Sequence, residues 1–397
     1  MNHTKKKILF VMNNLRCGGA EKALVSLLQT FDYSLYEVDL LLLKKEGLFL
    51  NQVPAEVTIL PSPFGYSFFD MSFVTAILQC LKIGRFDIIF RRIKMVFLFK
   101  AETNAVVREQ KLWRYLGSIL PKLSGSYDTA IGFLEKTPNY YCVDKVDAIT
   151  KIGFIHNDYE ELKLDVSLDL PYFDRFDYIA TVSERCLHSL QRSFPNHLNK
   201  LLIIGNITSP KLVLQLAEAP VEPLFNGLKL MTMGRLSPQK GYDMLVHSAK
   251  ILKDSQLDFK WYILGVGELQ AEIEELIVAN QLEENIIFLG LKENPYPYIF
   301  QSDIYVQPSR FEGKSVAIDE AKILCKPIIV TDFSTAADQI QNGENGLIVS
   351  MNPESISKGI IRMVNDVDFQ HKIKINLLAE MKGNENEIEK LYQLINV

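Results

Sequence analysis

The sequence is poor in the features that mark secreted, metal-bound or membrane-spanning proteins. Its 397 residues contain only five cysteines, scattered and odd in number, with no Cys-x-x-Cys pair. Such usage fits a reducing, cytoplasmic compartment and argues against a disulfide framework or a zinc site. No uninterrupted apolar run approaches about 18 residues, so we predict no transmembrane helix. The start resembles a signal peptide, but Asn13 cuts the apolar run from Ile8 to Met12 short, which indicates a first strand.

Basic residues are not in excess overall, since the formal net charge is −5, but they gather in one region. From Lys82 to Lys122, ten basic residues accompany three acidic ones, a net charge of +7. Such asymmetry points to an anionic partner for this region alone. The basic residues predicted to share one helical face are Lys82, Arg85, Arg92 and Lys100, interleaved with Ile88, Ile89, Phe90, Phe97 and Phe99.

Two interpretations of the 82–122 region stay open. It is either a docking surface for anionic lipid, which makes the protein peripheral on the inner face of the cell membrane, or a solvated basic helix over an ordinary core. No recognition motif for nucleic acid accompanies the charge, so we expect no nucleic-acid partner.

Short apolar strands alternate with amphipathic helices along most of the chain. This alternation is typical of parallel, doubly wound α/β sheets, and the length suggests two domains. We predict two Rossmann-like domains, residues 1–208 and 228–379, joined by a proline-containing linker at 209–227. The strands that open the two series are Ile8–Met12, Val38–Leu43, Val57–Leu60 and Leu230–Met233.

The stretch between two predicted strands, Ile304–Val306 and Ile328–Val330, is the most informative. A glycine-containing loop opens a predicted helix there, from Ser315 to Leu324. Unpaired backbone N–H groups at the positive end of such a helix bind anions, phosphate above all. We therefore assign phosphate binding to the backbone of Gly313, Lys314, Ser315 and Val316.

Two carboxylates bracket this loop. Glu312 precedes the helix, and Glu320 lies more than a turn inside it. At that spacing the two side chains cannot grip one small ion together, but they can hold two parts of an extended ligand whose phosphates lie between them. A nucleotide-sugar has that shape.

The same arrangement of strand end, glycine turn and helix start recurs after Leu230–Met233. Gly234 begins the turn, and Tyr242 begins the helix. Between them, Arg235 can fork onto phosphate oxygens and Lys240 supplies a point charge. Both cations are therefore predicted to bind the diphosphate.

The first domain offers a third turn, Gly18-Gly19, at the strand end where doubly wound sheets bind ligands. Ligand binding and glycines needed only for close strand–helix packing both explain it. The turn lacks the Gly-x-Gly-x-x-Gly pattern of dinucleotide sites, which argues against a dehydrogenase. His156 has a comparable position, since it ends the predicted strand that begins at Lys151.

Taken together, these motifs resemble the retaining GT-B glycosyltransferases of family 4, glycosyl transferases group 1, of the bacterial cell-surface polysaccharide type. Glu312 and Glu320 match the family's Glu-x7-Glu element, and the residues from Gly234 to Gly241 match its Gly-Arg-Leu-x-x-x-Lys-Gly element. The resemblance implies two Rossmann-like domains facing a central cleft. It also implies that a last segment, 380–397, crosses back to the first domain.

The resemblance further implies roles for single residues. A similar Ile-His strand end places a histidine beside the donor sugar, which assigns His156. Glu312 would hold sugar hydroxyls, and Glu320 the ribose, because a carboxylate accepts two hydrogen bonds from a diol. The implied catalytic residues are His156, Arg235, Lys240 and Glu312, and the implied nucleotide-sugar-binding residues are Gly18, Gly19, Gly234, Arg235, Lys240, Leu291, Lys292, Glu312, Gly313, Lys314, Ser315, Val316 and Glu320.

The implied activity is metal-independent transfer of a hexose or N-acetylhexosamine, with a UDP-linked donor expected, to a cell-surface glycan or lipid-linked glycan acceptor. No cofactor is expected. The alternatives are a non-catalytic nucleotide-sugar-binding partner subunit, a nucleotide-sugar epimerase and a sugar phosphorylase. Asp366-Val367-Asp368 fits a manganese-binding pattern of another glycosyltransferase fold, but we interpret it as a helix terminus. Asp338 and Lys314-Ser315 depart from the commonest family pattern and leave the donor open.

Overall fold

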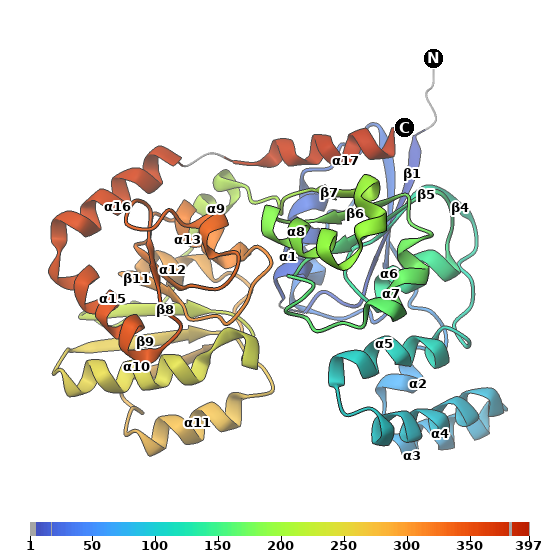
Figure 1. The fold of residues 1–397 in the computed structure, drawn as a ribbon, viewed down its shortest axis with the longest axis horizontal. Coiled ribbons are helices and arrows are strands. Elements are labelled where there is room, and N and C mark those ends of the chain that lie inside the picture. The colour runs from blue at the N-terminus through green and yellow to red at the C-terminus, as the bar shows by residue number, and fades with distance from the viewer. Residues whose placement is uncertain (1–4, 17, 381–382, 397) are drawn as a thin grey trace. The chain divides into compact units, whose positions relative to one another are not determined.

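The computed structural model describes residues 5–16, 18–380 and 383–396 (Figure 1). The chain divides into two compact units. Unit 1 comprises Met1–Arg16, Leu27–Gly205 and Ile388–Val397, and unit 2 comprises Cys17–Ser26 and Asn206–Glu387. Each unit is built on its own parallel sheet, which confirms the prediction of two Rossmann-like α/β domains.

Unit 1 contains a seven-stranded sheet and the helices that accompany it. Its strands are β1 (Lys6–Met12), β2 (Tyr36–Leu42), β3 (Thr58–Leu60), β4 (Ser126–Gly132), β5 (Asp147–Ile155), β6 (Tyr178–Thr181) and β7 (Leu201–Ile203). Its helices are α2 (Ser67–Asp70), α3 (Phe73–Lys82), α4 (Phe86–Ala101), α5 (Ala105–Leu116), α6 (Thr137–Lys145), α7 (Val166–Phe173), α8 (Glu184–Ser193) and α17 (Ile388–Ile395). Helix α1 (Gly19–Gln29) follows β1, but its residues 19–26 are assigned to unit 2 and only its last turn to unit 1.

The strand order in unit 1 is β3-β2-β1-β4-β5-β6-β7, with neighbouring strands parallel. The chain builds outward from β1 in one direction and then in the other, so β1 and β4 flank the topological switch point. Doubly wound sheets bind ligands at this point, beyond the carboxyl ends of the strands. β1 is buried without interruption from Ile8 to Met12, as expected of a strand covered on both faces.

Unit 2 repeats the same plan with six strands. Its strands are β8 (Leu228–Met233), β9 (Phe259–Leu264), β10 (Ile286–Gly290), β11 (Ile304–Gln307), β12 (Ile328–Thr331) and β13 (Leu347–Val349). Its helices are α9 (Pro210–Ala217), α10 (Tyr242–Asp254), α11 (Gln270–Ala279), α12 (Tyr296–Gln301), α13 (Val316–Ile323), α14 (Ala336–Gln339), α15 (Pro353–Asn365) and α16 (Val367–Glu380). The order β10-β9-β8-β11-β12-β13 puts the switch point between β8 and β11.

Both faces of the unit 2 sheet are buried, because side chains of one strand alternate between two hydrophobic clusters. On β8, Leu230 joins one cluster and Met231 the other, and Ile329 and Val330 do the same on β12. Helices α10, α11 and α15 supply the first cluster, and α9, α12 and α13 supply the second. The two clusters hold the strand ends of this sheet in place.

The predicted linker and the last segment of the chain both form helices that pack on a unit. Helix α9 forms within the stretch predicted as a linker, 209–227, and its Val213 and Ala217 are buried in a unit 2 cluster. Helix α17 packs on unit 1, where the ring of Tyr392 stacks on Tyr36 with 4.9 Å between centroids. The Lys6 ammonium donates to the carbonyl of Ile395 at 2.8 Å.

The basic region is not a single amphipathic helix. A turn with Gly84 at φ +70° separates α3 from α4, so Lys82 and Lys100 belong to different helices. Arg92 turns inward and donates to the carbonyls of Phe69 and Met71 at 3.0 and 2.8 Å. The predicted common face of these cations is therefore wrong. Within the part of the chain that the structure describes, no helix has the length and apolar character needed to cross a membrane.

Candidate functional site

Two loops meet at the switch point of unit 2. One follows β8, from Gly234 to Gly241, and the other follows β11, from Pro308 to Ser315. Gly241 has φ +66°, and a Cβ there would lie 2.0 Å from the carbonyl oxygen of Pro308. Only glycine tolerates both this conformation and this approach. The last glycine of the first loop therefore fixes the two loops against each other.

Glu312 is the centre of a buried hydrogen-bond network. Its Oε1 accepts from Lys240 Nζ at 2.5 Å, from Ser309 Oγ at 2.6 Å and from Gln307 Nε2 at 3.0 Å. Its Oε2 has only Gln239 Nε2, at 3.5 Å. Three donors on one oxygen hold the carboxylate in a single orientation and leave the other oxygen with spare capacity to accept.

The sequence did not reveal the neighbours that orient Glu312. Tyr305 donates its hydroxyl to Gln307 Oε1 at 2.7 Å, which leaves the amide of Gln307 to donate to Glu312. Thr335 donates to the Glu312 carbonyl at 2.9 Å. The one available hint was a polar residue, Gln307, at the end of a buried strand, because such a residue needs a partner.

Glu320 lies on α13, apart from that network, and is 1% exposed. Tyr296 donates to its Oε1 at 2.9 Å, and Lys22, which belongs to unit 2, forms an ion pair with the same oxygen. Burial and the Glu320 charge raise the pKa of Tyr296, so its hydroxyl stays protonated and donates. Glu320 Oε2 has no hydrogen-bond partner among the described residues. The two glutamates thus have separate partners, as their spacing predicts.

The start of α13 only partly matches the predicted anion site. The helix begins at Val316 after Ser315, in agreement with the sequence. However, the Ser315 N–H donates to the side chain of Gln339 at 2.8 Å, and Gln339 donates back to the Ser315 carbonyl at 2.8 Å. The N–H that Ser315 was expected to offer is therefore occupied. Gly313 is buried, and Lys314 is half-buried, beside it.

The other predicted residues of unit 2 lie at the same edge of the sheet. Gly234 and Arg235 directly follow β8, and the Arg235 side chain is exposed. Leu291 and Lys292 directly follow β10, with the Lys292 ammonium 5.4 Å from the centroid of the Tyr298 ring. Among the described residues, neither Arg235 nor Lys292 forms a hydrogen bond or an ion pair with Glu312, so Lys240 is the predicted cation that the structure brings to Glu312.

In unit 1, His156 follows β5 and is 6% exposed. Its ring stacks on Phe154 and tilts against Phe133, with centroids 5.6 and 4.8 Å away. Glu135, which the sequence did not suggest, accepts the His156 N–H at 3.1 Å and the Asn157 side-chain amide at 2.9 Å. These contacts fix the backbone and the ring of His156.

The glycines at the start of α1 are not equivalent. A Cβ on Gly19 would meet no atom within 4 Å, so close packing does not require this glycine. A Cβ on Gly18 would collide with the carboxylate of Glu21. The Glu21 carboxylate is the far end of a flexible side chain that can move aside, so close strand–helix packing explains neither glycine.

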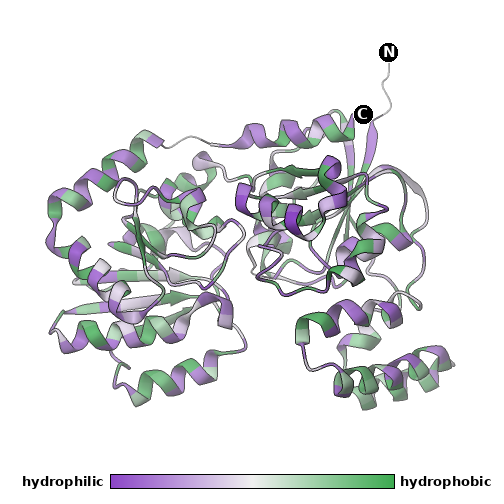
Figure 2. Ribbon diagram, viewed as in Figure 1, coloured by the Kyte–Doolittle hydropathy of each residue, from purple (hydrophilic) through white to green (hydrophobic). Residues whose placement is uncertain are grey.

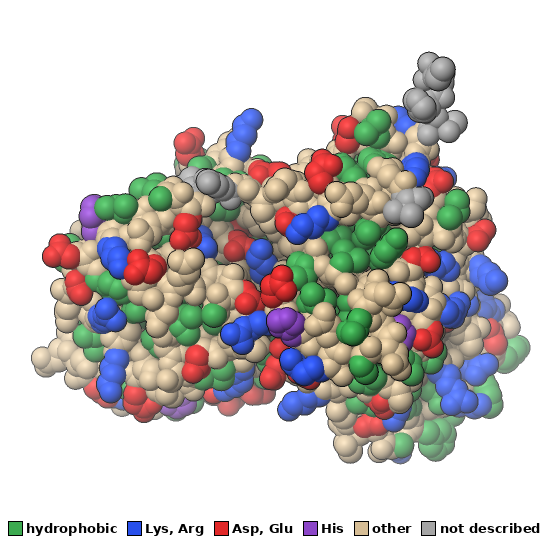
Figure 3. Space-filling view, turned by 45° about the horizontal axis from the view of Figure 1, so that its top comes forward, with side chains coloured by type: hydrophobic (Ala, Val, Ile, Leu, Met, Phe, Trp, Pro, Cys, Tyr) green, Lys and Arg blue, Asp and Glu red, His purple; other side chains and the backbone are tan. Residues whose placement is uncertain are grey.

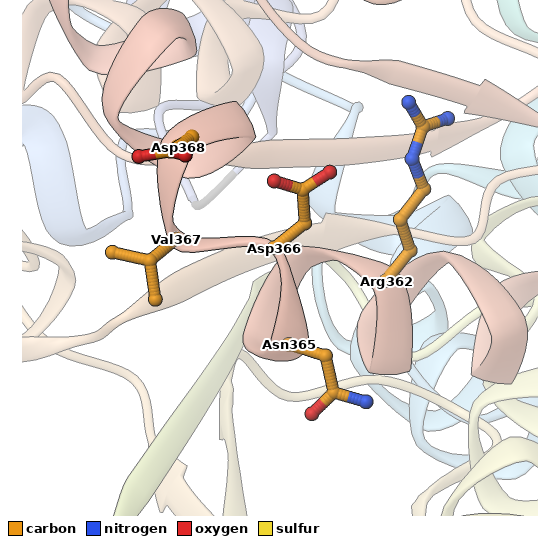
Figure 4. A pocket seen from close by; sticks show the side chains of 5 residues that line it. All are labelled: Arg362, Asn365, Asp366, Val367 and Asp368. Atoms are coloured by element: carbon orange, nitrogen blue, oxygen red, sulfur yellow. The ribbon is translucent and has the colours of Figure 1, made fainter.

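Asp366 is a helix-terminal residue, as predicted. It follows α15, and its carboxylate accepts the Phe369 N–H in the first turn of α16 at 2.9 Å. Figure 4 shows Asp366 and Asp368 around a pocket that Arg362, Asn365 and Val367 also line. Across the described residues, no group of three or more His, Cys, Asp or Glu side chains is arranged to hold a metal ion.

Comparison with known proteins gives these loops a family context. Residues 223–377 match the family described as glycosyl transferases group 1. Over 181 residues the chain is 29% identical to an uncharacterized glycosyltransferase of Methanocaldococcus jannaschii, covering 44% of this chain and 45% of that protein. The chain therefore spans less than half the length of this relative.

A second relative matches nearly end to end. It is the Campylobacter jejuni N-acetylgalactosamine-N,N'-diacetylbacillosaminyl-diphospho-undecaprenol 4-alpha-N-acetylgalactosaminyltransferase, 25% identical over 377 residues and 91% of each chain. Among solved structures, Anabaena HepE in complex with UDP-glucose has a TM-score of 0.66 at 16% identity, covering 98% of this chain and all of that one.

These matches do not favour a partner subunit, an epimerase or a phosphorylase. The matched segment includes both loops at the unit 2 switch point, with Lys240, Glu312 and Glu320. Residues 223–377 thus match glycosyl transferases group 1, and the comparisons support a glycosyltransferase with the GT-B fold.

Proposed function

We propose that this chain is a retaining glycosyltransferase that moves a hexose or N-acetylhexosamine from a UDP-sugar to a glycan or lipid-linked glycan acceptor. The observation that carries the proposal is Glu320, a carboxylate 1% exposed whose Oε2 lacks a partner among the described residues. A buried acceptor left unsatisfied costs about 1–3 kcal/mol. A ribose diol would satisfy it.

The relatives support the class of donor and acceptor. The name of the Campylobacter relative describes transfer of an N-acetylgalactosaminyl group to a sugar carried on diphospho-undecaprenol. The Anabaena structure holds UDP-glucose. We extend to this chain the donor chemistry, a UDP-linked sugar, and the acceptor chemistry, a glycan that includes the lipid-linked kind.

In this proposal the leaving diphosphate is stabilised by protein groups alone. Breaking the bond to the sugar builds negative charge on the phosphate oxygens, and fixed cations and amides stabilise it without reorganisation. Lys240 is held at the switch point by Glu312, and exposed Arg235 lies in the same loop, free of any ion pair within the described chain. The N–H groups of Val316 and Ala317 at the start of α13 add a third donor set.

Glu312 is proposed to bind the sugar. Its Oε1 already accepts three hydrogen bonds, whereas its Oε2 has one weak contact at 3.5 Å. A sugar hydroxyl that donates to Oε2 would satisfy the second oxygen of the carboxylate and leave the ion pair with Lys240 intact. We also assign His156, whose ring is fixed by two phenylalanines at the end of β5, to binding of the sugar.

The proposal is tested by turnover with a panel of UDP-, GDP- and dTDP-sugars and lipid-linked glycans as acceptors. We expect UDP release and a larger glycan with at least one UDP-sugar, and a yield of both products about tenfold or more lower with Glu320→Gln at a subsaturating donor concentration. Glu275→Gln, an exposed glutamate on α11, is the matched control. Tight UDP binding without turnover on any donor would favour a non-catalytic subunit instead.

A further inference from the structure

Helix α4 exposes apolar side chains in a regular order. Phe86, Phe90, Ile93 and Phe97 recur at i, i+4, i+7 and i+11, which aligns them along one side of the helix. Their side chains are 65, 56, 40 and 66% exposed. An apolar stripe of this spacing ordinarily faces a core, whereas this one faces solvent.

Helix α3 presents a second stripe with the same spacing. Val74, Leu78 and Leu81 are each at least half exposed. The opposite side of the hairpin packs inward, where Cys80 and Ile88 form a small cluster with Phe68. This inner cluster fixes which sides of α3 and α4 face outward. Figure 2 shows that hydrophobic residues alternate with hydrophilic ones along α3 and α4.

The hairpin of α3 and α4 is held to unit 1 by its inner side, so its exposed apolar stripes are left uncovered. Arg92 binds two carbonyls of the segment before α3, at Phe69 and Met71. The neighbouring helix α5 buries Trp113 and Leu116 in the main cluster of unit 1. These contacts hold α3 and α4 to the unit from their inner side. We define the docking face as the two exposed apolar stripes on α3 and α4 together with the exposed lysines of these helices, Lys82, Lys94 and Lys100.

Positive charge accompanies the docking face. From Phe73 to Ala101 there are six Lys and Arg residues and one carboxylate, Asp87, a net charge of +5. Asp87 is paired with Arg85 at 2.7 Å. In the described chain, Lys82, Lys94 and Lys100 are exposed and have no carboxylate within ion-pair distance.

The cations lie beside the apolar side chains. The Lys94 ammonium is 4.4 Å from the centroid of the Phe90 ring, and Lys100 is one turn beyond Phe97. Long lysine stems can cover apolar surface while their charged ends reach a polar layer. In Figure 3, hydrophobic and basic side chains are intermixed at the lower right, where this hairpin lies in Figure 1.

We propose that the docking face binds an anionic lipid bilayer, with the phenylalanines and leucines at the boundary of the acyl chains and the lysines at the headgroup phosphates. Apolar burial plus attraction to anionic lipid is how amphipathic helices bind membrane surfaces. A second copy of this chain fits the face poorly, because self-pairing would bring two surfaces of net charge +5 together. Anionic lipid neutralises that charge.

Vesicle co-sedimentation of the full chain tests the proposal. The probes are vesicles of equimolar phosphatidylglycerol and phosphatidylcholine, and vesicles of phosphatidylcholine alone. We expect binding to the anionic vesicles that falls by about tenfold or more on neutral vesicles or at high salt, where surface charges are screened. The variant Phe86→Ser/Phe90→Ser/Phe97→Ser should lose binding by about tenfold or more on the same vesicles.

Two further variants keep the test specific. Lys82→Gln/Lys94→Gln/Lys100→Gln should weaken binding and reduce its salt dependence. Ile375→Ser/Leu378→Ser removes two exposed apolar residues of α16 and should leave binding unchanged. Equal binding to neutral and anionic vesicles, or binding to neither, overturns the proposal. The proposal is also overturned if the protein is a dimer in solution and the phenylalanine variant is a monomer that still binds vesicles. A second copy of the chain would then occupy the docking face.

Discussion

Lys240 and Glu312 form an ion pair, with 2.5 Å between Nζ and Oε1, that joins the loop after β8 to the loop after β11. The two side chains are 16 and 8% exposed. Breaking such a pair by removing one partner leaves a buried charge without compensation, whereas removing both does not. The pair therefore acts as a unit, and its cation is positioned before any ligand arrives.

The first prediction concerns Lys240. Lys240→Gln should lower kcat by roughly 10²–10³-fold, because one fixed donor to the leaving diphosphate is lost. It should also destabilise the fold by about 3–5 kcal/mol, since Glu312 stays buried and charged. Steady-state kinetics and thermal unfolding measure the two effects.

A double variant separates stability from catalysis at this position. Lys240→Gln/Glu312→Gln should recover stability without recovering turnover. Lys250→Gln, which breaks an exposed ion pair with Asp254 on α10, is the control and should change neither. Full turnover in a stable Lys240→Gln protein would refute the leaving-group role of Lys240.

The second prediction concerns Glu320. Glu320→Gln preserves the size of the side chain but removes the charge that accepts from the ribose. UDP affinity, measured by calorimetry on a folded variant, should fall by about 1.5–3 kcal/mol, the scale of a hydrogen bond to a charged group. Tyr296→Phe deletes the neutral donor to Oε1 and should cost less. Unchanged UDP affinity in Glu320→Gln would contradict the ribose assignment.

The sequence predicted the local order around this site well. Three elements form where the spacing of apolar residues and the position of the glycine turn predict them. They are the strand at Ile304, the helix that starts after Ser315 and the strand at Ile328. Periodicity and turn chemistry are local, so one sequence is enough to read them. The GT-B fold followed from motifs spread over both halves of the chain.

The partners of the site residues could not be predicted in the same way. Tyr296 donates a hydrogen bond to Glu320 from another helix. The side chain of Gln339 accepts the Ser315 N–H, although the two residues are 24 positions apart in the sequence. Such contacts depend on how elements pack, which periodicity does not encode. The prediction that Lys82 and Arg92 share one helical face was wrong for a local reason. The turn that contains Gly84 separates α3 from α4, so the helical periodicity does not continue from one residue to the other.

The third prediction is that activity requires no divalent metal. Turnover should survive EDTA, because the cations and amides proposed at the diphosphate already oppose its charge. Asp366→Ala/Asp368→Ala should keep its turnover yet lose about 0.5–2 kcal/mol of stability, since Asp366 caps α16. Loss of turnover that manganese alone restores would overturn the leaving-group account.

The last prediction is stereochemical. An inverting enzyme needs a base on the face of the sugar opposite the leaving group. Glu312 is unsuited to that task, because its Oε1 already accepts from Lys240, Ser309 and Gln307 and its Oε2 is proposed to hold a hydroxyl of the donor sugar. The acceptor proton can instead pass to the departing phosphate, with attack from the same face through an oxocarbenium-like state. An α-linked donor should therefore give an α-linked product. Proton NMR of the freshly formed product decides this, and a β anomeric signal would mean that Glu312 or another group serves as the base.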